Sequence, residues 1–171
     1  LLINHHDGAD LQYAFALNKT NGRTVWNTKR SVDYKDLGPD GKPKAGGDWR
    51  KAYATPHIFK INGKSVLVSS GAKAHYGYEP ATGRELWRVV ELGQHSAAAR
   101  PICGHDLFYI STGFSKSQLM AIRPGGKGIV TDTHVAWRYA RSGVPEKPSL
   151  LLVGDLLYMV DDKGGLVTCV E

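Results

Sequence analysis

Large and small apolar residues alternate along short segments of the chain, and each segment ends at a turn signal. In residues 13–17, Tyr13, Phe15 and Leu17 alternate with two alanines, as in a strand that carries its large side chains on one face. No long segment has the periodicity of an amphipathic helix, and 20 glycines and 8 prolines are typical of a turn-dense chain. The pattern therefore predicts an all-β fold.

Apolar segments that open with proline recur between the alternating segments. They cover residues 56–59, 101–103 and 148–152, and each precedes a turn and a strand-like segment rich in β-branched and aromatic residues. Proline suits the first residue of a strand, where no ladder donor is needed. The turn after the first segment is Asn62-Gly63, which is a strong hairpin signal.

One phrase of the sequence occurs twice, at residues 16–26 and 77–87. In each copy a small residue and an acidic or amide residue precede a tight glycine turn, and a tryptophan follows four residues after the glycine. Gly22 and Gly83 are 61 residues apart, and so are the two tryptophans. Repetition at a fixed period indicates a repeat architecture rather than an isolated motif.

The phrase resembles the tryptophan-docking motif of the pyrroloquinoline quinone (PQQ)-like β-propellers, the quinoprotein alcohol dehydrogenase-like family. In that family the motif reads Ala-x-Asp-x-x-Thr-Gly-x-x-x-Trp, and its tryptophan packs between adjacent blades. A third copy here is degraded by a longer glycine-rich loop, and a fourth begins at residue 165. The resemblance assigns the structural blade motif to Ala16, Asn18, Gly22, Trp26, Glu79, Thr82, Gly83, Trp87, Ala121 and Trp137.

The resemblance implies blades of four antiparallel strands in an incomplete ring, within one partial propeller domain over residues 1–171. Because propellers generally have four to eight blades, we expect a fragment of about three blades from a longer protein. An open fragment leaves strand edges uncovered, so we also expect self-association that completes the propeller. The expected division is a partial blade at 1–30, full blades at 54–90 and 99–139, and a partial blade at 147–171.

Composition narrows the choice of partners. The chain carries 22 basic and 16 acidic residues, a net charge of +6, and the basic residues are scattered, which argues against nucleic-acid binding. No apolar run is long enough to span a membrane, and no signal peptide is visible. Export to the bacterial periplasm is implied by the resemblance alone.

The two cysteines, Cys103 and Cys169, lie 66 residues apart. A disulfide between them is one interpretation, but two buried free thiols are the favoured one. The resemblance adds that quinoprotein alcohol dehydrogenases carry two adjacent cysteines against the quinone ring. This chain has no such pair, which counts against a complete catalytic site.

In propellers of this kind, the loops between second and third strands and those between blades lie on one face, at the channel mouth. The densest polar cluster of that face, residues 5–10, offers nitrogen and oxygen ligands for a metal. Adjacent histidines on a strand point to opposite faces, so a polar hairpin is favoured over a metal site. The polar residues expected on this face are His5, His6, Asp7, Asp10, Tyr53, Lys73, His75, His95, Arg100, Lys116, Glu146, Lys147, Asp161 and Asp162.

Three basic residues of this face, Arg100, Lys73 and Lys147, are candidate ligands for the carboxylates of a quinone cofactor. Solvated loop charge is the alternative and the favoured interpretation. Arg100 is the best candidate because it directly precedes a strand-opening proline. The catalytic base and calcium ligands of the quinoprotein enzymes match no assignable residue in this chain.

Two expanded loops interrupt the repeat. Residues 33–49 are rich in glycine and proline, which predicts a surface loop, and residues 123–132 form a second one on the opposite face. A candidate partner surface follows the first loop, because aromatic and arginine side chains are enriched at binding hot spots. Packing of the tryptophan against its own blade is the alternative. The residues of this surface are Trp49, Arg50, Tyr53 and His95.

Three functions fit these observations. The favoured one is a non-catalytic repeat module that binds a protein or peptide as an assembly platform, without a cofactor. The alternatives are part of a PQQ- and calcium-dependent alcohol or sugar dehydrogenase, and a sensor module attached to another domain. Because the motif marks blades and not an activity, the fold alone does not decide among them.

Overall fold

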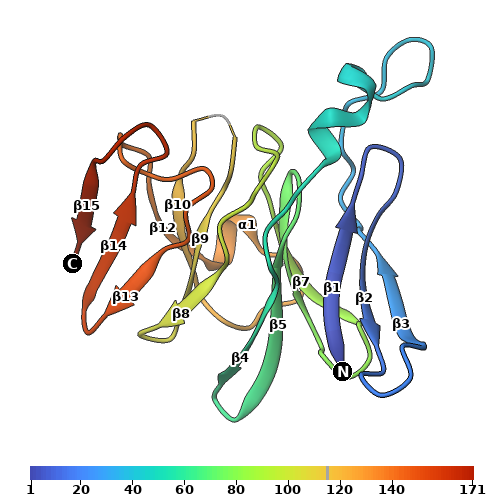
Figure 1. Cartoon of the computed structure of the whole chain (residues 1–171), viewed down its shortest axis with the longest axis horizontal. Helices are drawn as coiled ribbons and strands as arrows, with labels where there is room; N and C mark the ends of the chain where they lie inside the picture. The colour runs from blue at the N-terminus through green and yellow to red at the C-terminus, as the bar shows by residue number, and fades with distance from the viewer. Residues whose placement is uncertain (115) are drawn as a thin grey trace.

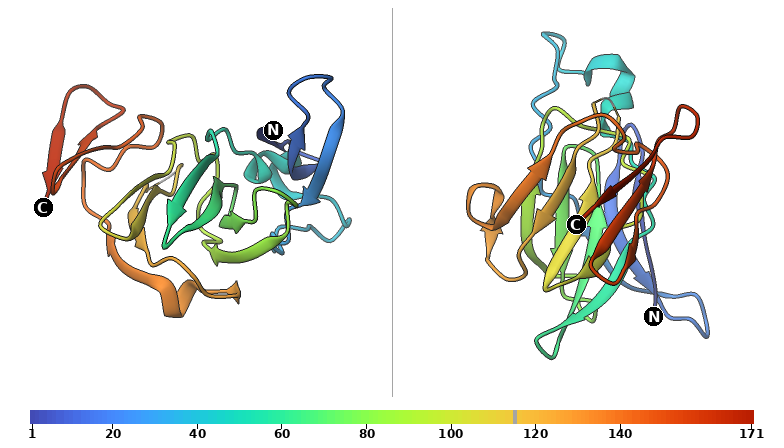
Figure 2. Two further views of the ribbon diagram at one scale, coloured as in Figure 1. Left: turned by 90° about the horizontal axis from the view of Figure 1, so that it is seen from below. Right: turned by 90° about the vertical axis from the view of Figure 1, so that its left-hand side faces the viewer.

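The computed structural model describes residues 1–114 and 116–171 as four sheets placed side by side in an open arc (Figures 1 and 2). The two termini lie at opposite ends of the arc. The first sheet contains β1 (Leu2–Asp7), β2 (Gln12–Leu17) and β3 (Thr24–Lys29). The second contains β4 (His57–Ile61), β5 (Lys64–Ser70), β6 (Ala74–Tyr78), β7 (Glu85–Val90) and β11 (Gly128–Ile129).

The third sheet contains β8 (Ile102–Gly104), β9 (Leu107–Ser111), β10 (Leu119–Ile122) and β12 (Val135–Tyr139). The fourth contains β13 (Leu151–Val153), β14 (Leu156–Val160) and β15 (Val167–Val170). Successive strands pair antiparallel, and β4, β8 and β13 each form one edge of their sheet. The prediction of an all-β fold with antiparallel blades and no closed ring is confirmed, and the sheets contain three to five strands.

The cores lie between neighbouring sheets rather than within them. Large side chains of one sheet pack on those of the next, as Trp87 of β7 packs on Phe108 of β9 with ring centroids 5.8 Å apart. A further core joins the first and second sheets, and another joins the third and fourth. Burial between sheets explains why the strands carry large residues on alternating positions.

The repeated tryptophan occupies the same register position in three sheets. Trp26 is paired with Ala16, Trp87 with Gly77, and Trp137 with Ala121, each next to a shift in register. The partner is small because the indole lies over it. A Cβ atom on Gly77 would come within 2.2 Å of the Trp87 ring.

A turn of the following sheet docks on the first tryptophan. The Trp26 Nε1–H donates to the carbonyl oxygen of Pro80 at 3.0 Å, and the Thr28 hydroxyl donates to that of Gly83 at 2.7 Å. Gly83 has a left-handed φ of +71°, and a Cβ there would lie 2.4 Å from the Trp26 ring. Gly83 is therefore required both by its backbone conformation and by the close approach of the indole.

The loop predicted over residues 123–132 is more ordered than expected. It contributes β11, which pairs in parallel with β7, and the short helix α1 (Thr131–His134). The Val130 N–H donates to the Arg88 carbonyl at 2.9 Å, so this segment covers the outer edge of β7 beside Trp87. The longer loop thus takes the docking role that the turn at 79–84 has on Trp26.

Two other predicted loops contain regular structure. His5, His6 and Asp7 were expected in a loop but lie in β1, and His75 lies in β6, fully buried. The segment after residue 33 includes a short 3₁₀ stretch, Lys44–Arg50, with left-handed residues inside it. Strand pairing with β2 explains the first difference, and it directs His5 and Asp7 to the buried face of β1 while His6 is exposed on the other face.

That ion pair joins the first two sheets. The Arg30 guanidinium donates twice to the Asp7 carboxylate, at 3.0 and 2.9 Å, and once each to the hydroxyls of Ser69 and Tyr78. The same guanidinium lies over the Tyr76 ring, 4.7 Å from its centroid. Two buried charges are tolerated here because both are paired and hydrogen-bonded.

The cysteine prediction is half right. Cys103 and Cys169 are both free, as favoured. Cys103 is half-buried, and burial followed by the charge of Asp106 raises the pKa of its thiol. Cys169 lies exposed on β15, because the last sheet of the arc has no sheet packed on its far side.

Candidate binding face

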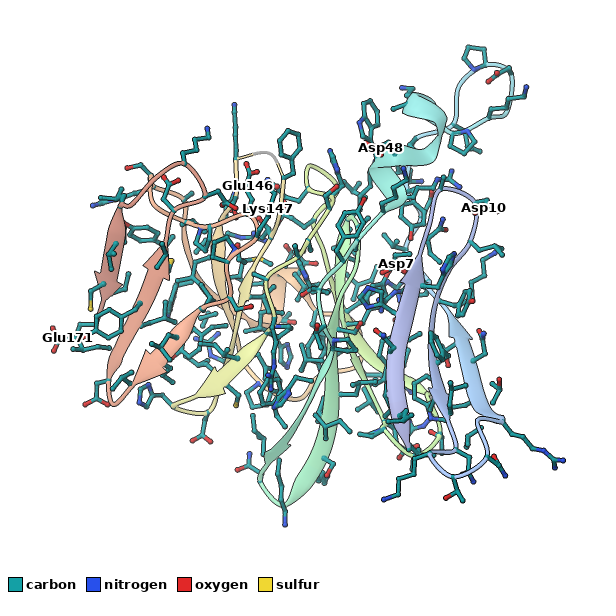
Figure 3. All side chains as sticks on the ribbon, viewed as in Figure 1. Asp7, Asp10, Asp48, Glu146, Lys147 and Glu171 are labelled. Atoms are coloured by element: carbon teal, nitrogen blue, oxygen red, sulfur yellow. The ribbon has the colours of Figure 1, made fainter. Side chains whose placement is uncertain are left out.

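Connections between the sheets gather along one side of the arc, the upper side in Figure 3. Glu146, Lys147, Asp48 and Asp10 lie along this side. Two pockets open there and share Glu146 in their walls. We call this side the loop face.

The first pocket is apolar and has a volume of about 520 Å³. Tyr53 and Phe114 form much of it, and 62% and 50% of their surfaces are exposed. Ala98 adds a small apolar contact, and Glu146 and Lys147 place opposite charges at the rim. A half-exposed aromatic pair with a charged rim has the composition of a protein-binding hot spot.

Backbone hydrogen bonds hold the loops of this pocket in place. The Tyr53 N–H donates to the Ala97 carbonyl at 2.7 Å, and the Ser96 N–H donates to that of Lys51 at 2.8 Å. His95 and Phe114 exchange both of their backbone hydrogen bonds, at 3.0 and 2.9 Å. The aromatic side chains are thus presented by three connected loops, which lowers the entropy lost when a partner binds.

The backbone of the charged rim is held by the fourth sheet. The Asp162 carboxylate accepts the backbone N–H groups of Glu146 and Lys147. The Lys147 ammonium lies 3.9 Å from the same carboxylate and is largely exposed. Asp162 thereby joins the loop after β14 to the loop before β13.

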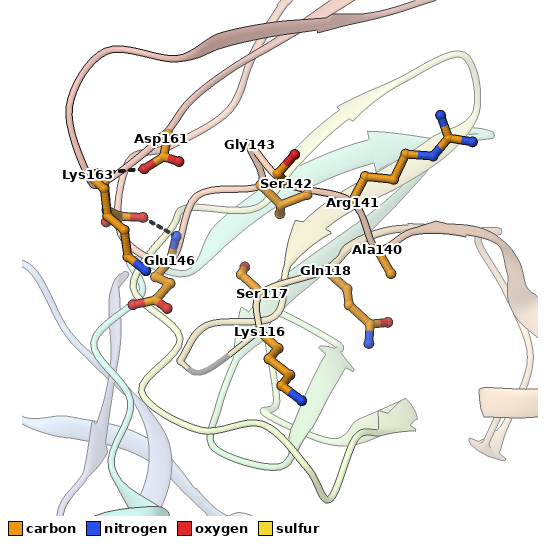
Figure 4. A pocket seen from close by; sticks show the side chains of 12 residues that line it. Lys116, Ser117, Gln118, Ala140, Arg141, Ser142, Gly143, Glu146, Asp161 and Lys163 are labelled. Carbon is orange, nitrogen blue, oxygen red and sulfur yellow. Dashed lines mark hydrogen bonds between the residues drawn. The ribbon is translucent and has the colours of Figure 1, made fainter.

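The second pocket is polar, with a volume of about 510 Å³ (Figure 4). Three basic side chains, Lys116, Arg141 and Lys163, and three acidic ones, Glu146, Asp161 and Asp162, line it. Ser117 and Pro145 connect its walls, since the serine hydroxyl donates to the proline carbonyl at 2.7 Å. The balance of charges suits polar segments of a protein partner better than a simple anion or cation.

The four residues of the predicted partner surface have different environments. Tyr53 lines the apolar pocket, and the half-buried His95 ring packs on Phe114 with centroids 5.5 Å apart. Trp49 is partly exposed, and the Lys73 ammonium lies 5.8 Å from its ring. Arg50 has a structural role, because its guanidinium donates two hydrogen bonds to the Asp36 carboxylate, at 3.0 and 2.6 Å.

The structure does not bring the three candidate cofactor residues together. The Lys73 side chain is buried and its ammonium donates to the Tyr34 carbonyl at 2.8 Å; burial lowers the pKa of this amine. Arg100 lines a third pocket, between the inner strands, and Lys147 lies on the rim of the apolar one. Among the residues that the structure describes, these three side chains do not form a common binding site for a quinone. We therefore assign no quinone chemistry to them.

In the polar cluster at residues 5–10, His5 and Asp7 are engaged within the protein, whereas His6 and Asp10 are exposed. Asp7 is paired with Arg30, and His5 Nε2 lies 3.7 Å from the same carboxylate. Burial, the largest cause, lowers the pKa of His5. Within 1–114 and 116–171, no three His, Cys, Asp or Glu side chains are grouped to hold a metal ion.

Sequence reasoning missed Phe114. The residue follows Gly113, whose φ is +97° and whose missing Cβ would lie 2.5 Å from the His95 carbonyl oxygen. A glycine directly before an aromatic residue in a loop was the available signal, because it marks a close approach of two backbone segments.

Comparison with known proteins identifies the repeat. A family model described as outer membrane protein assembly factor BamB matches residues 12–170. No curated protein matches the chain. The structured part of the chain contains no helix that is long and apolar enough to cross a membrane.

Two solved structures are similar. The crystal structure of BamB from Moraxella catarrhalis is 11% identical with a TM-score of 0.52, and the match covers 94% of this chain and 42% of that chain. A protein of unknown function from Bacteroides caccae is 11% identical with a TM-score of 0.37, covering 98% and 72% of the two chains. The first likeness confirms the propeller fold. This chain spans less than half the length of that BamB chain.

Proposed function

Because the chain belongs to the family described as outer membrane protein assembly factor BamB, we propose that it is a non-catalytic module that binds a protein partner during outer-membrane protein assembly. The single observation that carries the proposal is the apolar pocket of the loop face. Tyr53 and Phe114 are half-exposed there, although the loops that present them are held by backbone hydrogen bonds.

The chemistry of the pocket favours a particular kind of partner. An exposed tyrosine and phenylalanine around about 520 Å³ accommodate one large apolar side chain. Glu146 and Lys147 at the rim suit polar neighbours of either charge. A strand of an outer-membrane barrel alternates apolar and polar residues, so an unfolded strand offers both features.

The proposed function implies a location in the bacterial periplasm. Membrane barrels are assembled from segments that expose aromatic and aliphatic residues before they insert. A second copy of the chain is a further partner that we propose, because both end sheets of the arc expose apolar side chains. These include Leu2 and Val25 at one end and Val160 and Val167 at the other.

A peptide-binding measurement tests the main proposal. The probe is a fluorescent peptide that copies one membrane-facing strand of an outer-membrane barrel, and its anisotropy is recorded against protein concentration. We expect Tyr53→Ala and Phe114→Ala each to weaken binding about tenfold or more, as hot-spot truncations do. Ile129→Ala is the matched control, because Ile129 is 61% exposed but lies on the outer edge of the second sheet.

The outcomes separate clearly. Loss of affinity in the two aromatic variants, with Ile129→Ala unchanged, supports the loop face as the site. Equal affinity in all three variants, or no saturable binding by the wild type, contradicts the proposal. Urea unfolding of each variant checks that the loss is not a loss of folding.

A further inference from the structure

A third pocket lies on the inner side of the arc, away from the loop face. It has a volume of about 410 Å³ and is lined by β4, β8, β13 and the residues just before the last two strands. These are the edge strands of three successive sheets. Because it needs three sheets, the pocket exists only when the blades are assembled side by side.

The pocket holds positive charge without an acidic partner. Arg100 and His57 line it, and a guanidinium nitrogen of Arg100 lies 3.1 Å from Nε2 of His57. None of the lining residues is acidic, and no carboxylate of a described residue lies within ion-pair distance of Arg100. Two groups that carry or can accept a positive charge are therefore held together with no anion between them.

The local structure keeps these groups in position. The Arg100 backbone N–H donates to the Ser149 hydroxyl at 3.1 Å, which ties the start of β8 to the start of β13. The His57 ring packs on Phe59 with centroids 4.4 Å apart. Burial and then the charge of Arg100 lower the pKa of His57, so the ring is neutral at pH 7 and leaves the guanidinium as the single fixed charge.

Most of the remaining wall is apolar. Phe59, Ile102 and Leu152 line it from three different strands. β8 and β13 approach closely there, since a Cβ atom on Gly104 would lie 2.1 Å from a methyl carbon of Leu152. A ligand that fits must combine an anionic group with an apolar part.

We propose that this inner pocket binds a carboxylate carried on an apolar group, with Arg100 as its ion-pair partner and Phe59 and Leu152 against the apolar part. A planar guanidinium matches a carboxylate in two parallel hydrogen bonds. The same chemistry is offered by a small aliphatic acid and by the C-terminal carboxylate of a polypeptide that ends in an apolar residue. The site is independent of the loop face.

Calorimetric titration with three probes tests the proposal. The probes are hexanoate, a short peptide with an apolar C-terminal residue and a free carboxylate, and the same peptide with an amidated end. We expect saturable binding of hexanoate, of the free-acid peptide, or of both, and none of the amidated peptide. Hexanoate alone identifies a small-acid site, whereas the free-acid peptide identifies a site for chain ends.

Variants locate the binding. Arg100→Gln is expected to weaken it at least tenfold, as loss of a charge-assisted pair does. Arg23→Gln is the matched control, because Arg23 is an exposed arginine in the turn between β2 and β3. Tyr53→Ala is also expected to bind normally, which separates this site from the loop face.

The His57 ring gives a second readout in the wild-type protein. A carboxylate on Arg100 offsets the positive charge that opposes protonation of the ring, so we expect the NMR-measured pKa of His57 to rise on binding. No binding of any probe, equal binding by Arg100→Gln, or binding that leaves His57 unmoved would overturn the proposal.

Discussion

Two glycines of the repeat allow the free energy that the contact between sheets contributes to be separated from the cost of backbone strain. Gly22 and Gly83 have the same φ of +71°, and both occupy the turn before the tryptophan strand. A Cβ on Gly22 would meet nothing within 4 Å, whereas one on Gly83 would lie 2.4 Å from the Trp26 ring. The two alanine variants therefore share the free-energy cost of the left-handed backbone, but only Gly83→Ala also carries the cost of the clash with the indole.

The shared cost is the left-handed conformation, which an alanine adopts at a penalty of about 1 kcal/mol. Gly83→Ala must also displace the indole, and overpacking of this kind costs about 1–3 kcal/mol. The hydrogen bonds from Trp26 to Pro80 and from Thr28 to Gly83 are strained by the same movement, at about 1 kcal/mol each. We expect Gly22→Ala to lower the free energy of unfolding by about 1 kcal/mol and Gly83→Ala by about 4–6 kcal/mol.

Urea unfolding followed by tryptophan fluorescence gives the free energy of unfolding of both variants. Equal m-values would show that the variants differ in stability and not in the surface exposed on unfolding. A red shift of the folded-state emission is expected in Gly83→Ala alone, because Trp26 becomes exposed. Equal losses in the two variants would refute the reasoning, since the contact between turn and indole would then contribute nothing.

Three further predictions concern the cores. Trp87 is 1% exposed and Trp137 is 38% exposed, so in urea unfolding we expect Trp87→Ala to cost about 4 kcal/mol and Trp137→Ala only about 2–3 kcal/mol; equal losses would argue against the docking account. Asp7→Asn leaves the buried Arg30 guanidinium without its counter-charge, and the same assay should show a loss of about 3–5 kcal/mol, whereas a loss below about 1 kcal/mol would contradict the pairing. Burial lowers the pKa of His75 to about 3. This histidine therefore becomes protonated near pH 6.5 in the unfolded chain but stays neutral in the folded protein until about pH 3. The free energy of unfolding should therefore fall as the pH drops from 6.5 toward 3, by at most about 1.4 kcal/mol per pH unit, and less steeply in His75→Leu; identical slopes would exclude His75 as the cause.

The blades were predictable because their signals are local. Alternation of residue size, strand-opening prolines and the glycine turn before each tryptophan all act within a few residues. The loop at 123–132 was predicted only as irregular, because β11 gains its hydrogen bonds from β7, some 40 residues earlier in the chain. Pairing with a distant edge leaves no trace in local composition.

The candidate site was predicted less well than the fold. Tyr53 and His95 were recognised as surface candidates by residue type, but their joining through Phe114 depends on a contact between two separate loops. Lys73 was interpreted as a free loop charge, although its amine reaches the Tyr34 carbonyl of a distant segment. Arg50 was assigned to a partner surface for its side-chain type, and its pairing with Asp36 became visible only in three dimensions.

The measurement that tests the central claim most directly is hydrogen exchange of the protein with and without an unfolded outer-membrane barrel protein diluted from denaturant. The account predicts slower exchange in the segments around Tyr53, Ser96 and Phe114, with the edge of β12 unchanged. Tyr53→Ala should lose this protection while retaining its exchange pattern in the free state. Protection confined to other surfaces, or no change on adding the partner, would contradict a binding function for the loop face.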